Sequence, residues 1–143
     1  TMLDATYDDH KLGQCPNYYT YTFCDHTGQQ LIYAPDNSGL LTFSYDDEIR
    51  NNLNLDASVS IYFTDDFYTY DDYDHVNSQE GYSKIDARIA ISSADERWHL
   101  ALLGKNLSDK LTTSYNQMSG NVGSYVSILE RTRSFALQFG YSF

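Results

Sequence analysis

The sequence predicts an all-β fold, an antiparallel meander of about six strands joined to their neighbours along the chain. Three observations predict it. Apolar and polar residues alternate with period two in about six stretches. No run reaches the roughly 20 apolar residues that a transmembrane helix needs. The connections between the stretches alternate between short and long.

The most regular stretch is the last one, residues 133–143. Its aromatic and aliphatic residues fall on one face, and the other face carries small or weakly polar residues with no charge after Arg133. A soluble sheet usually carries charged residues on its outer face. An apolar face toward lipid and a second face toward water is the pattern of a transmembrane β-barrel strand, and terminal aromatics suit its interfacial girdle.

The other stretches show the same alternation and define the expected topology. They are residues 2–7, 41–45, 53–63, 84–91 and 98–103. The connections at 46–52 and 92–97 are short and polar, whereas those at 10–39, 64–81 and 107–130 are long. Short turns on one side of a sheet and long loops on the other are typical of an outer-membrane barrel.

Composition narrows the function classes. The chain has 143 residues, with 9 Lys and Arg against 20 Asp and Glu and a net charge of −11, which excludes a nucleic-acid-binding protein. The mean hydropathy of −0.52 suits a soluble protein, but barrel strands alternate and hide their membrane face in such an average. The first residues carry no export signal, so we expect the chain to be a fragment whose amino-terminal part is missing.

Sequence signatures of enzymes are missing. The chain has no Gly-x-Ser-x-Gly, His-Glu-x-x-His, phosphate-loop or dinucleotide-binding pattern. We therefore expect no enzymatic activity and no cofactor. A hydrolase site built on His99 and a neighbouring serine is the weaker alternative.

Four segments resemble a known family. Residues 98–109, WHLALLGKNLSD, look like the "W-x-L-x-L-x-G-x-N-L-x-D" strand near the end of TonB-dependent outer-membrane receptors, and residues 133–143 resemble their last strand. Residues 3–7 and 28–35 resemble, less specifically, the stretch before the final strands. The likeness covers essentially the whole chain.

The resemblance implies that residues 1–143 are the carboxy-terminal segment of a 22-stranded transmembrane β-barrel, without its plug domain and earlier strands. It implies TonB-dependent uptake of a scarce nutrient, such as a ferric siderophore, across the outer membrane of a Gram-negative bacterium. The implied partners are outer-membrane lipid and lipopolysaccharide, the assembly machinery and a small-molecule ligand. The TonB complex would act only through the missing amino-terminal part.

The resemblance also gives the terminal aromatics a role. In the family the final aromatic residue belongs to the signal that the outer-membrane assembly machinery reads, and Phe143, with Tyr141 and Phe139, holds this place here. The alternative is that Phe143 is one more girdle aromatic. Asn106 and Asp109 are predicted to be structural, because such residues at a strand-to-loop junction hydrogen-bond their own backbone and stabilise a turn.

Cys15 and Cys24 lie in the first long loop and are predicted to form a disulfide, as an even cysteine count, short spacing and extracellular setting favour. The alternative is a metal site that also uses His10 and His26, although the four residues lack a recognised zinc spacing.

The second long loop is acidic. Carboxylates at this density can hold calcium, but the fixed spacing of an EF-hand is missing, so a solvated surface loop is the simpler interpretation and no metal is assigned. The acidic residues are Asp65, Asp66, Asp71, Asp72 and Asp74, with Glu80.

Charged residues on the inner face of the predicted barrel are candidates for the substrate path. They are Lys84, Asp86, Arg88 and His99, with Gln138. They equally suit structural pairs within the barrel wall.

Arg131 and Arg133 share the parity of Phe135, so they are predicted to point outward near the rim of the barrel. Guanidinium groups there suit the phosphates of lipopolysaccharide.

Two other classes of function stay open. One is a small structural or adhesive outer-membrane barrel, for which about six strands are too few, since the smallest known barrels have eight. The other is a soluble all-β binding module, which the sorting of loop lengths and the last strand disfavour.

Overall fold

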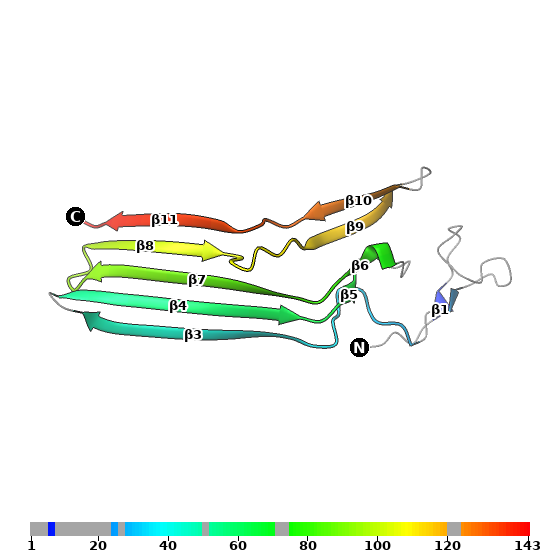
Figure 1. Cartoon of the computed structure of the whole chain (residues 1–143), viewed down its shortest axis with the longest axis horizontal. Coiled ribbons are helices and arrows are strands. Elements are labelled where there is room, and N and C mark those ends of the chain that lie inside the picture. Colours follow the sequence, from blue (N-terminus) through cyan, green and yellow to red (C-terminus); the bar gives the residue numbers. More distant parts are fainter. Residues whose placement is uncertain (1–5, 8–23, 26–27, 50–51, 71–74, 120–123) are drawn as a thin grey trace. The chain divides into compact units, whose positions relative to one another are not determined.

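The computed structural model describes residues 6–7, 24–25, 28–49, 52–70, 75–119 and 124–143 (Figure 1). The chain forms two units. The sheet unit comprises Ser38–Phe63, Tyr82–Leu111 and Arg131–Phe143, and the loop unit comprises Thr1–Asn37, Thr64–Gly81 and Thr112–Glu130. In the described residues the only helix is one short 3-10 turn, η1 (His75–Asn77). The predicted all-β class is confirmed.

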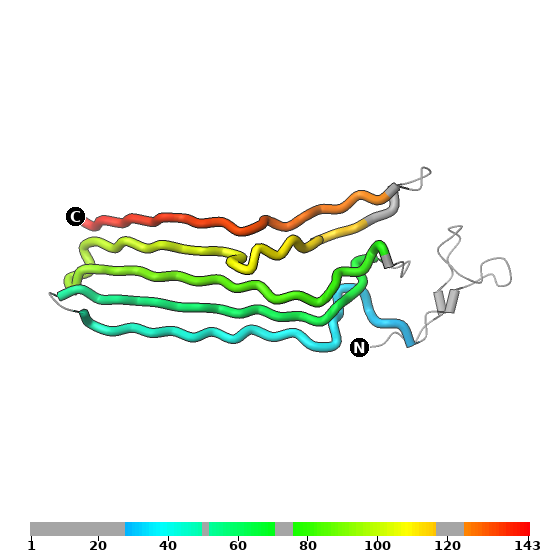
Figure 2. The backbone as a smooth tube through the Cα atoms, in the orientation of Figure 1, coloured from blue at the N-terminus to red at the C-terminus, as the bar shows by residue number. Residues whose placement is uncertain are grey.

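The sheet unit is built from five strands that follow one another as a meander. They are β3 (Ser38–Ile49), β4 (Leu53–Thr64), β7 (Tyr82–Ser93), β8 (Trp98–Lys105) and β11 (Ser134–Tyr141). Their order in the sheet is β11-β8-β7-β4-β3, and successive arrows point in opposite directions (Figure 1). Figure 2 shows the five backbones side by side. The antiparallel meander is confirmed, and the described residues close no barrel.

Thr6 and Tyr7, the described part of the first expected strand (residues 2–7), are not part of this sheet. They form β1 (Thr6–Tyr7), which pairs antiparallel with β2 (Cys24–Asp25) as a separate two-stranded sheet. Residues 1–5 lie outside the described part of the chain. The expectation of about six strands in one sheet is therefore corrected to five.

Two of the expected long loops contain hairpins that the sequence did not reveal. β5 (Phe67–Tyr68) pairs with β6 (Ser78–Gln79), and β9 (Thr113–Ser119) pairs with β10 (Ser124–Leu129). Their ladders are local and antiparallel. A local ladder satisfies backbone donors and acceptors whatever the side chains, so these short strands need no long apolar alternation of the kind that marks the others.

Strand register gives the sheet two different faces. Gly104 lies opposite both Phe135 and Ala87, and Ala101 lies opposite both Gln138 and Ala90, so side chains of one kind continue from strand to strand. The apolar face carries Leu41, Phe43, Tyr45, Leu55, Ala57, Val59, Ile61, Phe63, Ile85, Ala87, Ile89, Ile91, Trp98, Leu100, Leu102, Gly104, Phe135, Leu137, Phe139 and Tyr141. The polar face carries Thr42, Ser44, Asp46, Asn54, Asp56, Ser58, Ser60, Tyr62, Lys84, Asp86, Arg88, Ala90, Ser92, His99, Ala101, Leu103, Lys105, Ala136, Gln138 and Gly140.

Hydrophobic burial is almost absent from this structure. Ala90 and Ala101 are the only buried hydrophobic residues in the described ranges, and they pair with each other on the polar face. A soluble domain normally encloses its large aliphatic and aromatic side chains in a core. Here those side chains lie on the apolar face, so the backbone ladder, and not an enclosed core, holds the sheet together.

Candidate functional site

The apolar face is exposed along its whole extent. On β11 the exposed fractions are 67% for Phe135, 72% for Leu137 and 67% for Phe139. Side chains on the other four strands are exposed as well: Leu41, Phe43, Tyr45, Val59, Phe63, Ile89, Leu100 and Leu102. A contiguous apolar surface of this size is rare on soluble monomers and marks a surface that another apolar phase or partner covers.

Charge is almost excluded from this face. Along the five strands, Asp47 near the end of β3 is the single charged residue with the parity of the apolar face. Its carboxylate accepts a hydrogen bond from the hydroxyl of Tyr45 at 2.9 Å. An apolar phase could therefore cover the middle of this face without burying a charged side chain.

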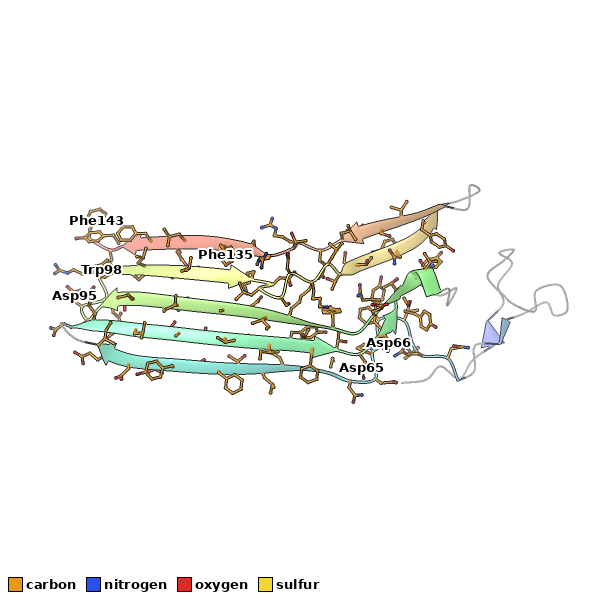
Figure 3. All side chains as sticks on the ribbon, in the orientation of Figure 1. Asp65, Asp66, Asp95, Trp98, Phe135 and Phe143 are labelled. Carbon is orange, nitrogen blue, oxygen red and sulfur yellow. The ribbon has the colours of Figure 1, made fainter. Side chains whose placement is uncertain are left out.

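Aromatic residues gather at one end of the sheet. Trp98 pairs with Tyr141 across the β8–β11 ladder, and the rings of Tyr141 and Phe143 meet edge to face at 5.1 Å between centroids. Figure 3 shows Trp98 and Phe143 at the same end as Asp95, in the turn that joins β7 to β8. Beyond β11, the Ser142 amide donates to the Arg97 carbonyl at 2.7 Å, which fixes the last residues beside this turn. The role of Phe139, Tyr141 and Phe143 in assembly stays a prediction.

The polar face carries two ion pairs. The Lys105 ammonium lies 2.7 Å from one carboxylate oxygen of Asp86, whose other oxygen accepts from the backbone amide of Asn106 at 2.8 Å. Arg88 pairs with Asp56 on β4. A cavity of about 160 Å³ is lined by Asp86, Lys105 and Arg88 of these pairs, together with Ser58 and Ser60. Lys105 and Asp56 were not predicted as site residues. Only the register between strands brings Lys105 to Asp86 and Asp56 to Arg88.

The four predicted path residues do not form one cluster. Lys84, Asp86 and Arg88 share the polar face of β7, with the Lys84 ammonium 5.1 Å from the centre of the Tyr82 ring. His99 lies instead on β8, against Gly140 of β11. The arrangement provides a wall of paired charges and hydroxyl groups, and its role in a substrate path stays a prediction.

Asn106 and Asp109 build the turn after β8, and their predicted structural role is confirmed. Asn106 has φ 51° and Asp109 has φ 54°. The Asn106 side-chain amide donates to the Lys110 carbonyl at 2.8 Å, and its oxygen accepts from the Lys110 amide at 3.0 Å. The Asp109 carboxylate accepts from the backbone amide of Arg133 at 3.0 Å. This turn therefore fixes the start of β11.

The loop unit joins segments that are distant in the sequence. The Tyr33 amide donates to the Tyr68 carbonyl at 2.8 Å, and its hydroxyl donates to the Ser114 carbonyl at 3.3 Å. The amide of Thr113 donates to the side-chain oxygen of Gln79 at 2.8 Å. Burial, with a smaller contribution from Tyr115, raises the pKa of Tyr33, so its hydroxyl remains a donor at neutral pH.

The acidic second loop, predicted as a solvated surface loop with calcium binding as the alternative, is described only in part. Asp65 accepts from the side-chain amide of Asn37 at 2.7 Å, and the Asp66 carbonyl accepts from Gln30 at 3.4 Å. Asp71, Asp72 and Asp74 lie outside the described residues. Across the ranges that the structure covers, no three His, Cys, Asp or Glu side chains converge as a metal site would require.

The predicted disulfide also lies outside the described residues. Cys15 belongs to a range that the structure leaves out, and Cys24 is described only by its backbone place in β2.

The two arginines predicted at the rim differ in their contacts. Arg133 lies 3.5 Å from the Asp109 carboxylate, and Arg131 is exposed.

None of the helices formed by the described residues is long and apolar enough to cross a bilayer. Comparison with family models, curated proteins and solved structures finds no match to this chain.

Proposed function

We propose that this chain is the carboxy-terminal part of the β-barrel of a TonB-dependent outer-membrane receptor, which takes up a scarce nutrient. The observation that supports the proposal most is the contrast between the two faces of one sheet. Leu137, 72% exposed, and its neighbour Gln138 point to opposite sides of β11. The same contrast continues across all five strands.

A barrel wall explains this contrast physically. In lipid every backbone donor and acceptor needs an internal partner, and an antiparallel ladder provides one while its outer side chains stay apolar. An outward apolar band about 25 Å tall with aromatic girdles, facing a polar interior, is the general pattern of such walls. Trp98, Tyr141 and Phe143 would form part of one girdle.

The polar face would then line the interior of the barrel. The Lys105–Asp86 and Arg88–Asp56 pairs place charge where water or a plug domain can solvate it. A ligand that crosses the barrel would meet these groups, together with Lys84 and the serine hydroxyls of β4.

The partners of the proposed receptor follow from the two faces. Outer-membrane lipid and lipopolysaccharide would cover the apolar face, and the assembly machinery would read the segment that ends at Phe143. The TonB complex would act through a plug domain that these residues do not include. A ferric siderophore is the preferred ligand on the strength of the family resemblance.

Two alternatives explain less. A small structural barrel needs at least eight strands, whereas the described sheet has five. A soluble binding module would have to leave Phe135, Leu137 and Phe139 in water, at the exposures given above. The isolated sheet needs both an apolar covering and further strands.

The membrane part of the proposal is tested with two spin labels, on Leu137→Cys and Gln138→Cys, in a Cys15→Ser/Cys24→Ser background. In lipid–detergent micelles the label at 137 should collide more with oxygen, which partitions into lipid, and the label at 138 more with a water-soluble nickel chelate. Ser134→Cys serves as a second control for the polar face. Equal accessibility at 137 and 138 would contradict a barrel wall.

The transport part is tested in cells. Deleting the gene that encodes the chain should abolish uptake of one ferric chelate, and deleting the TonB system should have the same effect. Normal uptake of every chelate, vitamin and sugar tested in the gene deletion would exclude a receptor.

A further inference from the structure

The apolar face is hollowed by a groove of about 480 Å³ that crosses all five strands. Its middle is lined by the small residues Ala57, Ala87 and Gly104, and its ends are formed by Tyr45 on β3 and Phe135 on β11. Ala87 and Phe135 both pair with Gly104, so these residues lie in one row across the sheet.

The groove has the length of a lipid chain. Five adjacent strands are separated by four steps of about 4.8 Å, which gives a length of about 19 Å. One leaflet of a bilayer has a hydrocarbon thickness of about 15 Å. Strands of a membrane barrel tilt by about 40°, so a groove that runs across them is also oblique and suits a chain slightly longer than the leaflet is thick.

The five residues named above, Tyr45, Ala57, Ala87, Gly104 and Phe135, need no further polar partner. The hydroxyl of Tyr45, which is the polar group among the five residues of this row, already donates to Asp47. Next to the Phe135 end, Leu107 lies over Gly104, where an added Cβ would meet its Cδ2 at 2.7 Å. An apolar occupant therefore suits this row of residues.

Positive charge borders the Leu107 end of the groove. The Asn106 side-chain amide donates to the carbonyls of both Lys110 and Arg131, so these two cationic residues join the same turn as Leu107. Arg133 lies two residues before Phe135 on the same chain segment, half exposed. Asp109, which pairs with Arg133 at 3.5 Å, offsets part of this charge, and Lys110 and Arg131 are the other two cations of this turn.

We propose that the groove binds one acyl chain of an anionic membrane lipid, whose phosphate contacts Arg131 and Arg133. This inference rests on the proposed function, because it requires the apolar face to lie in a membrane. Guanidinium groups suit phosphate through paired N–H donors, and juxtamembrane cations favour anionic headgroups.

The experiment uses single-tryptophan variants of the whole chain in lipid–detergent micelles. In a Trp98→Phe background, Phe135→Trp places the probe in the groove and Leu137→Trp places it on the same strand and face outside the groove. Each variant is titrated with phosphatidylglycerol or phosphatidylcholine brominated on the acyl chains, which quench tryptophan on contact. Far-UV circular dichroism checks that each variant keeps its β-structure.

The groove probe should reach half-maximal quenching at about a tenfold lower mole fraction of brominated phosphatidylglycerol than the Leu137→Trp probe. Ala87→Leu, which fills the groove, should remove this difference, and Arg131→Gln with Arg133→Gln should remove the preference over phosphatidylcholine. Identical titrations at the two probes would overturn the lipid site while leaving the membrane face intact. An absence of quenching at both probes would instead overturn the proposed function, and equal preference for the two lipids would overturn the phosphate contact.

Discussion

The imidazole of His99 lies directly against the backbone of Gly140, its partner across the β8–β11 ladder. A Cβ built on Gly140 would lie 2.1 Å from Cε1 of His99, so only glycine leaves room for the ring in this position. A ring that covers a glycine in the neighbouring strand shields the backbone there and compensates for the missing side chain. The pair therefore strengthens the attachment of the terminal strand.

The first prediction concerns this pair. Gly140→Ala should lower the free energy of unfolding by about 1–3 kcal/mol, because the ring must leave its position. His99→Ala in the same chain should remove most of that penalty. Urea unfolding in detergent micelles measures both, and Ser134→Ala on the same face of β11 is the matched control. A Gly140→Ala penalty that is unchanged without the histidine would show that the contact is not the cause.

The second prediction concerns the turn after β8. Asn106→Ala should destabilise the sheet unit by about 1–3 kcal/mol, because the Lys110 amide and the Lys110 and Arg131 carbonyls lose their side-chain partner. Asn106→Gly relieves the positive φ but loses the same bonds, so it should recover only the smaller, conformational part. Equal stability of Asn106→Gly and the unchanged chain, by the same unfolding measurement, would mean that the hydrogen bonds contribute little.

The role of Asn106 was predictable because a turn depends on residues close in the sequence, and its side chain bonds to the backbone of Lys110, four residues along. Asp109 lies in the same turn, but its side chain bonds to the amide of Arg133, 24 residues away, and only the folded sheet unit brings the two together. The strands were predictable for a similar reason. Alternation over 53–63 and 98–103 marks β4 and β8 to within two residues at each end.

The third prediction separates the two bonds of Asp86. Asp86→Asn keeps an oxygen for the Asn106 amide but loses the charge that faces Lys105, and because that pair is half exposed the cost should be about 0–1 kcal/mol. Asp86→Ala loses both partners and should cost about 1–3 kcal/mol. A larger loss for the asparagine variant than for the alanine variant, in urea unfolding, would contradict this division.

The partners of these charges could not be predicted from the sequence. Asp86 meets Lys105, and Arg88 meets Asp56, only because the strands pair in one register out of several, and no single strand's pattern specifies that register. The hairpin of β9 and β10 was missed for a related reason. β9 carries polar residues such as Ser114 and Asn116 without apolar alternation, and the alternation in β10 is confined to Val126 and Ile128. Pairing between the two strands therefore defines the hairpin.

The fourth prediction concerns pH and the turn between β7 and β8. A hydrogen bond from Ser93, with the Arg97 amide, lowers the pKa of Asp95 below its ordinary value of 3.8. A carboxyl whose pKa is lower in the folded chain stabilises the fold above the pKa of the unfolded chain. This contribution disappears as the pH falls through the folded pKa, so the window lies below about pH 4.

Carboxyl NMR measures this effect directly. Ser93→Ala should return the pKa of Asp95 toward its ordinary value, because it removes the largest cause of the shift. Asp95→Asn should flatten the pH dependence of turn stability below about pH 4. An unchanged Asp95 titration in Ser93→Ala would contradict the assigned cause.

The last prediction follows from the two edges of the sheet. Because the sheet has five strands and each runs opposite to its neighbour, its edge strands β3 and β11 run in the same direction (Figure 1). An antiparallel barrel that closes on these edges therefore needs an odd number of further strands.

Without those further strands, each edge presents backbone donors and acceptors that lipid cannot satisfy and that in water favour pairing between molecules. We expect the 143-residue chain, refolded alone in detergent, to associate through β3 or β11 and to form no conducting pore. Semi-native gel electrophoresis and planar-bilayer recording measure this. A heat-modifiable monomer that conducts ions would show that these residues close a barrel by themselves, and the assignment to a larger receptor wall would be wrong.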